Sequence, residues 1–168
     1  MITLSMSTPP AVVQDAHERR HDLVADVLAL VTRGALDASA LQSRPAILRR
    51  LAAAAAQALP GGTDRLAARV ADAPLATAGA LYTGVPFALI GDRGAVILGD
   101  LHPSERVVLV ETLPVQNASS TPEVSRQLSQ SGADCLGIVT AVVPRTHGGE
   151  VDSIGLAEFH GRPTGIRS

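Results

Sequence analysis

Residues 106–120 read RVVLVETLPVQNASS, and this stretch decides the fold. The four consecutive apolar residues at 107–110 are typical of a strand buried on both faces in the middle of a parallel sheet. A polar loop, 112–120, leads from this strand to Ser120-Thr-Pro-Glu123, a capping box with Ser120 as the N-cap of a helix. Because the first N–H groups of a helix have no partner within it, this strand, loop and helix predict an anion site in the loop.

Strand and helix patterns alternate on both sides of this stretch. We expect strands at 64–70, 85–91, 106–111, 135–143 and around Ile154–Phe159, helices at 74–83 and 120–131, and a hairpin within 91–99. This series predicts an α/β fold with a doubly wound, mostly parallel sheet and helices on both faces. Ligands of such sheets bind beyond the carboxyl ends of the strands, where the 112–120 loop begins.

Two helical patterns precede the core. Apolar residues recur at helical spacing over 11–33, and a second helix is expected over 45–59, with Pro45 in its first turn. We expect residues 1–10 to be disordered, 11–62 to form a helical segment packed on the core, and 63–168 to form the α/β core of a single domain.

The composition excludes several classes of function. The 168 residues are 46% hydrophobic with a formal net charge of −2, so a basic surface for nucleic acid is not expected. No apolar run is long enough to cross a membrane, and residues 1–14 do not read as a secretory signal. Cys135 is the only cysteine, which favours a cytoplasmic protein. All 14 basic side chains are arginine, so no mechanism that needs a lysine can operate.

The segment 106–120 resembles the phosphoribosyl pyrophosphate (PRPP) loop of the type I phosphoribosyltransferases, which has apolar residues, two acids, a Thr/Gly-rich turn and a helix. ADAPLATAGALYTGVPFALI (71–90) and LSQSGADCLGIVTAVVPR (128–145) resemble the neighbouring elements, and the orotate phosphoribosyltransferases are the most similar branch. The resemblance covers most of 19–145. It implies the phosphoribosyltransferase-like fold with a reduced hood, phosphoribosyl transfer from PRPP to a base in pyrimidine nucleotide synthesis, Mg²⁺ bound with PRPP, and a homodimer.

The resemblance also implies roles for particular residues. Glu111 takes the place of one catalytic acid, and Thr112 stands where the second acid is expected. Arg145 matches an arginine that contacts the base, and Arg69 lies in the expected pyrophosphate loop near Ala67–Asp72. Together with Thr112 and Arg69, the residues expected to bind PRPP or its phosphate are Gln116, Asn117, Ala118, Ser119 and Ser120.

Several motifs depart from the family. Thr112 cannot replace the charge of a second acid, the pyrophosphate loop has no glycine, and Asp72 would repel pyrophosphate. The catalytic loop expected after Ile90 is short and offers only Arg93 and His102 as basic side chains. Since departure of pyrophosphate requires groups that stabilise its negative charge, we expect phosphoribosyl transfer to be weak or absent.

Three functions stay open: an active phosphoribosyltransferase, a non-catalytic member that binds a nucleotide or phosphate with a regulatory or partner-binding role, and a purely structural module. His17-Glu-Arg-Arg-His21 matches the HExxH pattern of zinc proteases, but its middle residues are charged and no third ligand follows. We favour a packing role for this helix. A metal site at His147-Gly-Gly-Glu150 is disfavoured, and no metal ligand is assigned.

Overall fold

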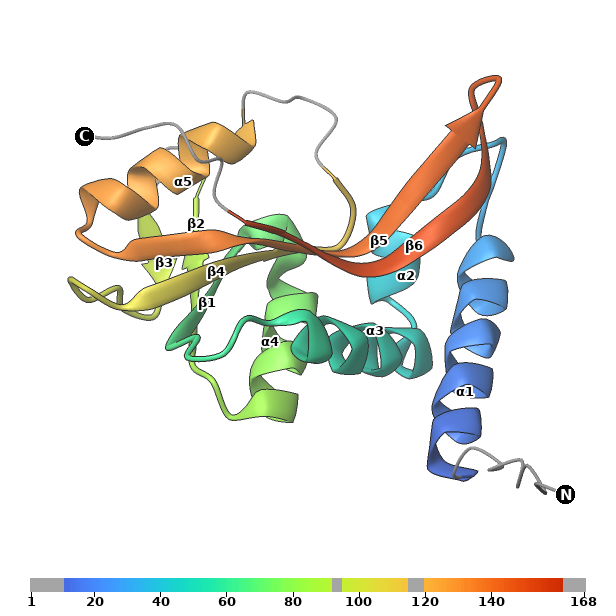
Figure 1. Ribbon diagram of the computed structural model, residues 1–168. Helices are drawn as coiled ribbons and strands as arrows, with labels where there is room; N and C mark the ends of the chain where they lie inside the picture. The colour runs from blue at the N-terminus through green and yellow to red at the C-terminus, as the bar shows by residue number, and fades with distance from the viewer. Residues whose placement is uncertain (1–10, 92–94, 115–119, 162–168) are drawn as a thin grey trace, which may run out of the picture.

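The computed structural model describes residues 11–91, 95–114 and 120–161, with side chains described from Arg20 onward and, in the last range, from Val124. The expected disorder of residues 1–10 lies outside this part. The helices are α1 (Ala11–Leu28), α2 (Ala38–Gln42), α3 (Pro45–Ala58), α4 (Ala73–Thr83) and α5 (Ser120–Gln130) (Figure 1). The strands are β1 (Arg65–Arg69), β2 (Phe87–Ile90), β3 (Val96–Leu98), β4 (Arg106–Glu111), β5 (Asp134–His147) and β6 (Glu150–Gly161).

The described strands form one sheet in the order β3-β2-β1-β4-β5-β6. β2, β1, β4 and β5 run parallel, while β3 and β6 pair antiparallel at the two edges. The sheet is therefore mostly parallel and doubly wound, as the sequence predicts. Because the chain turns outward in opposite directions from β1 and β4, the topological switch point lies between these two strands, and ligands of such folds bind at its carboxyl side.

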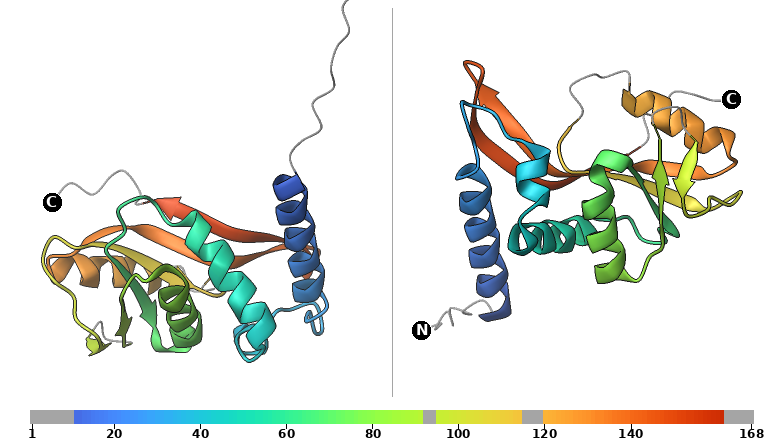
Figure 2. Two further views of the ribbon diagram at one scale, coloured as in Figure 1. Left: turned by 90° about the horizontal axis from the view of Figure 1, so that it is seen from below. Right: turned by 180° about the vertical axis from the view of Figure 1, so that it is seen from behind.

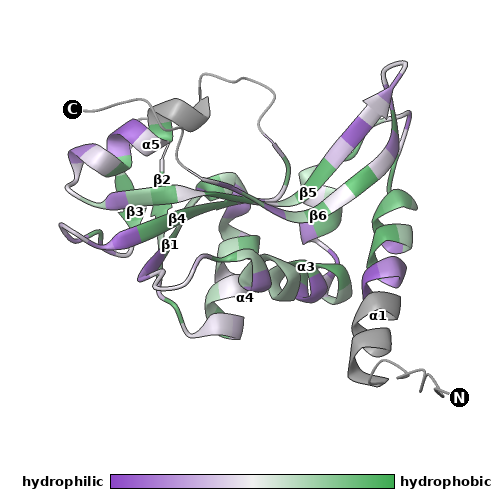
Figure 3. Ribbon diagram, viewed as in Figure 1, coloured by the Kyte–Doolittle hydropathy of each residue, from purple (hydrophilic) through white to green (hydrophobic). Residues whose placement is uncertain are grey.

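Strand β4 is buried on both faces, which explains its unbroken apolar run. Val107 and Leu109 pack with Val124 and Leu128 of α5, and Val108 packs in the cluster that also holds Ala55 of α3. Figure 2 shows α5 on one side of the sheet and α3 and α4 on the other. In Figure 3 the middle of the sheet is hydrophobic and the amino ends of β4 and β5 are hydrophilic, as expected for a sheet covered on both faces.

The last two strands are longer than the sequence pattern indicates. The expected strands at 135–143 and around 154–159 are the inner parts of one antiparallel hairpin that closes at His147↔Glu150. Gly148 and Gly149 form its tip with φ of 61° and 89°, a conformation that suits glycine in a two-residue hairpin turn. The hairpin extends past the rest of the sheet to α1 (Figure 1), where Ile154 and Leu156 join Leu23 and Val27 in the core.

The N-terminal helices also differ from expectation in detail. The first helix ends at Leu28 rather than near residue 33, because residues 32–35 form a tight turn closed by hydrogen bonds between Thr32 and Ala35. The short helix α2 was not predicted, although Asp37 caps it by accepting a hydrogen bond from the Ser39 N–H at 2.9 Å. The helix expected over 45–59 is confirmed as α3. Within the described ranges, no helix is both long and apolar enough to span a membrane.

Candidate active site at the switch point

Two charged side chains meet at the switch point of the sheet. Arg69 is the last residue of β1 and Glu111 is the last residue of the adjacent strand β4. The register of these strands places Ala67 beside Leu109, and therefore Arg69 beside Glu111 on the same face. This is the face that α5 covers further back in the strands, since Ala67 and Leu109 belong to the α5 cluster.

The carboxylate of Glu111 is held on both of its oxygens. Oε1 accepts a hydrogen bond from Thr140 Oγ1 at 2.7 Å, and Oε2 lies 3.3 Å from Arg69 Nη2. Glu111 is 4% exposed, and the side chain of Arg69 is 17% exposed. This arrangement is an ion pair sheltered from water, in which charge interactions are screened much less than at the surface.

Burial dominates the ionisation of Glu111. It raises the pKa of this carboxyl above its ordinary value of 4.5, and the nearby charge of Asp72 acts in the same direction. The hydrogen bond from Thr140 and the positive charges of Arg69 and His160 partly offset the rise in this pKa. A raised pKa in a polar cluster at a switch point is typical of functional sites.

A second set of polar contacts, around Asp72 and Thr112, lies next to the ion pair of Arg69 and Glu111. Asp72 is 8% exposed, and its Oδ1 accepts a hydrogen bond from the Thr112 N–H at 2.8 Å. The Thr112 carbonyl accepts one from the Val142 N–H at 3.0 Å. Gln42 of α2 donates to the Ala71 carbonyl at 2.9 Å. These bonds fix the turn after β1 against the start of the loop after β4.

Thr112 is therefore built into the fold. The residue is fully buried, its N–H and carbonyl are both bonded within the protein, and its Oγ1 has no hydrogen-bond partner. Asp72, which the sequence suggests would repel pyrophosphate, is instead buried and bonded to the Thr112 N–H. The sequence did not predict that the Asp72 carboxylate and the Thr112 backbone would support the site from within the fold.

The structure brings together only some of the residues that the sequence singles out. Arg69, Glu111 and Thr112 lie at the switch point, whereas the expected phosphate residues Gln116, Asn117, Ala118 and Ser119 fall outside the described residues. Ser120 is the first residue of α5, and its side chain is not described, so its role as an N-cap stays a prediction.

Arg145 lies away from this cluster. It is five residues beyond Thr140 on β5, which corresponds to about 17 Å along an extended strand. Its Nη2 lies 3.0 Å from Glu158 Oε1, and 62% of its side chain is exposed. A base contact at Arg145 would therefore require a ligand that extends from the switch point along the hairpin.

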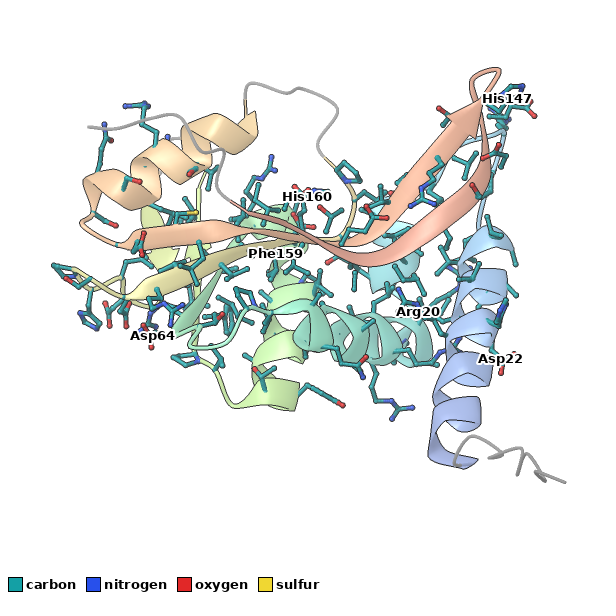
Figure 4. All side chains as sticks on the ribbon, in the orientation of Figure 1. Arg20, Asp22, Asp64, His147, Phe159 and His160 are labelled. Atoms are coloured by element: carbon teal, nitrogen blue, oxygen red, sulfur yellow. The ribbon has the colours of Figure 1, made fainter. Side chains whose placement is uncertain are left out.

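Two residues of this site were missed from the sequence. Thr140 is the one polar side chain in the run CLGIVTAVV, and this isolated hydroxyl in a buried strand was the available signal. His160 comes from β6, where it pairs with Ile138, and Figure 4 shows it on the opposite side of the sheet from Phe159. No local pattern could have placed His160 near Glu111, because the two come together only through the pairing of β4 with β5 and of β5 with β6.

Of the HExxH motif on α1, the structure describes only the side chains of Arg20 and His21. His21 is exposed on α1, while the buried residues of this helix, Leu23 and Val27, pack in the core. Arg20 donates to the Leu156 carbonyl at 3.0 Å, so the helix is anchored to β6. Among the described residues, no three His, Cys, Asp or Glu side chains are grouped to hold a metal ion.

Comparison with known proteins shows the fold. No family model matches the chain, and no curated protein matches it in sequence. Orotate phosphoribosyltransferase of Mycobacterium tuberculosis, solved with inorganic phosphate, is similar over 75% of this chain and 83% of its own, with a TM-score of 0.64 and 15% identity. A phosphoribosyltransferase from Corynebacterium diphtheriae is similar over 77% of this chain and 85% of its own, with a TM-score of 0.64 and 16% identity.

UMP synthase of Leishmania donovani is similar over 83% of this chain, with a TM-score of 0.62 and 23% identity. The chain spans only 37% of that protein's length. At these identities the similarity establishes the architecture. The chain has the type I phosphoribosyltransferase fold, in agreement with the resemblance found in the sequence.

Proposed function

We propose that this protein binds PRPP or a nucleotide at the switch point, in the manner of an orotate phosphoribosyltransferase, and that its phosphoribosyl transfer is weak or lost. The observation that carries the proposal is the pairing of Arg69 with Glu111 at the carboxyl ends of β1 and β4. One of the similar structures is an orotate phosphoribosyltransferase in complex with PRPP. The residues expected at 116–120 would supply the phosphate contacts.

The proposed loss of catalysis rests on missing positive charge. Only three residues separate Gly91 from Ala95, and the Gly91 N–H donates to the Ala95 carbonyl at 2.9 Å, so this connection is short. Of the two basic residues expected in this region, Arg93 lies outside the described residues, and His102 precedes β4 at the amino end of the strand, whereas Glu111 lies at the carboxyl end. With no lysine in the chain, few groups are available to stabilise a leaving pyrophosphate.

A Mg²⁺ ion does not fit the described carboxylates of the site. Mg²⁺ requires nearly octahedral oxygen ligands and gives up its water reluctantly. Both oxygens of Glu111 already have partners, and one of those partners is a guanidinium. Asp72 directs one oxygen to the Thr112 N–H. We therefore derive no step of the proposed function through a protein-bound Mg²⁺ ion.

The cellular setting is part of the proposal. We also propose that the protein is cytoplasmic, acts as a homodimer and binds a small phosphate ligand, with neither nucleic acid nor membrane as partner. The single cysteine, Cys135, is buried, and this supports a protein that does not depend on disulfides. The exposed apolar residues of the edge strand β3, Val96, Ile97 and Leu98, support self-association.

The experiment is calorimetric titration with PRPP, pyrophosphate and a panel of nucleotides, followed by a turnover assay with orotate. We expect PRPP or a nucleotide to bind and turnover to be slow or undetectable. Glu111→Gln should weaken binding by at least about tenfold, because it removes the anion that positions Arg69. Glu150→Gln, an exposed carboxylate at the hairpin tip, is the matched control. Absence of binding by any phosphate compound would overturn the proposal and favour the structural module.

A further inference from the structure

The positive charge at the switch point is a fixed part of the protein. Arg69 reaches across from β1 to Glu111 on β4, and their side chains are 17% and 6% exposed. Thr140 holds the other oxygen of the same carboxylate from β5, so three adjacent strands fix the position of the pair.

The same contacts leave little attraction for a divalent cation. The charge of Glu111 is balanced by a guanidinium 3.3 Å away, and a divalent ion bound to this carboxylate would be repelled by Arg69 at close range. The remaining buried acid, Asp72, is bonded to the Thr112 N–H and lies behind the pair. Thr112 adds no negative charge, although it directly follows Glu111.

From this geometry we propose that Arg69 takes the place of a divalent cation, so that the site binds PRPP in its metal-free form. This inference rests on the proposed function, since it concerns how the same site recognises the same ligand. The guanidinium supplies a positive charge that is already desolvated and oriented, and a negatively charged ligand needs no ion to mediate its contact with Glu111. Binding is therefore independent of Mg²⁺.

The test measures PRPP binding by calorimetry in Mg²⁺ and, separately, in EDTA. We expect the two dissociation constants to agree within about threefold. A larger loss of affinity in EDTA would overturn the inference and leave the proposed function standing. No binding in either buffer would overturn the proposed function and the inference with it. As a second measurement, Mn²⁺ titration followed by electron paramagnetic resonance should show no ion bound to the free protein, and a stoichiometric site would contradict the inference.

Arg69→Gln tests the role of the guanidinium directly. In EDTA this variant should bind PRPP at least about tenfold more weakly than the wild type, and Mg²⁺ should now restore part of the lost affinity. Arg49→Gln, an exposed arginine of α3 on the other side of the sheet, is the control and should behave as the wild type. Equal affinity of Arg69→Gln and wild type in EDTA, with both folded by their melting curves, would contradict the inference.

Discussion

At the scale of single residues, Glu111 is the group whose state is most strongly determined by its surroundings. Its carboxyl is withdrawn from water, and burial together with the charge of Asp72 raises its pKa more than Thr140, Arg69 and His160 lower it. The folded protein therefore binds a proton at this position more tightly than the unfolded chain does. Burial of Glu111 therefore shapes the site and also makes the stability of the protein depend on pH.

Glu111 should make the protein less stable as the pH rises from about 4.5 through its raised pKa. Over this interval the folded state holds more protons than the unfolded state, so the free energy of unfolding falls with pH, by at most about 1.4 kcal/mol per pH unit for one proton. In Glu111→Gln this component should be absent, as urea unfolding measured across the interval would show. Glu150→Gln should keep the wild-type slope, and a Glu111→Gln slope equal to the wild type would contradict the prediction.

Thr112→Val should stabilise the protein by about 1 kcal/mol, because the buried Oγ1 of Thr112 has no hydrogen-bond partner while valine has a similar shape. Chemical denaturation measures the change. PRPP affinity should be unchanged, since this side chain is enclosed in the fold. Weaker PRPP binding by the variant would place the Thr112 hydroxyl in the site, as the sequence resemblance implies.

At the scale of elements, the ends of the strands and helices are set by local residues that can be read from the sequence, such as a glycine at the end of a helix. Helix α4 ends at Gly84, whose φ of 74° is left-handed and whose N–H donates to the Ala80 carbonyl at 2.8 Å. A short loop then returns the chain to β2. Because this end of the helix needs a left-handed residue, the length of α4 was predictable, as was that of β4 from its apolar run.

Gly84→Ala should destabilise the protein by about 1 kcal/mol through backbone strain alone, since a Cβ at Gly84 meets no atom within 4 Å. Thermal unfolding of Gly84→Ala is compared with that of a matched variant, which separates backbone strain from the effect of adding a methyl group. Gly61→Ala also adds a Cβ that meets nothing within 4 Å, but without a left-handed backbone, and it should lose no stability. Equal effects of the two substitutions would argue against a conformational role for Gly84.

The β5–β6 hairpin is the element that local patterns described least well. Its outer half reads as a loop because it carries Pro144, polar residues and the pair Gly148-Gly149. The pair is itself a hairpin signal, and it could have led to the correct pairing of His147 with Glu150. The strands extend this far because their apolar residues, Ile154 and Leu156, are covered by α1.

At the scale of the whole molecule, one edge strand of the sheet exposes apolar side chains. Strand β3 is an edge strand whose three residues are all exposed, with Ile97 at 62% and Leu98 at 52%. Apolar edge strands present backbone groups that can pair with a second chain. This edge is therefore where we expect the proposed homodimer to form.

Ile97→Lys should shift the homodimer toward monomer by at least about tenfold in its dissociation constant, because a charge on an edge strand opposes pairing. Sedimentation at several concentrations measures the shift. Leu81→Lys, on the 84% exposed residue of α4, provides the comparison and should leave the dimer intact if the β3 edge is the interface. A wild-type protein that sediments as a monomer at every concentration would contradict the homodimer itself.

The sequence by itself determined the order and type of most elements, because buried parallel strands require unbroken apolar runs and helices require capping or terminating residues at their ends. Through the family resemblance it also singled out Arg69 and Glu111 as candidate site residues. Only the tertiary structure decided that these two form a sheltered ion pair, that Thr140 and His160 join them, and that Asp72 and Thr112 bond to each other. These relations arise from strand order and register, which bring together residues far apart in the sequence, such as Asp72 and Thr112, which are 40 positions apart. No local pattern encodes such contacts.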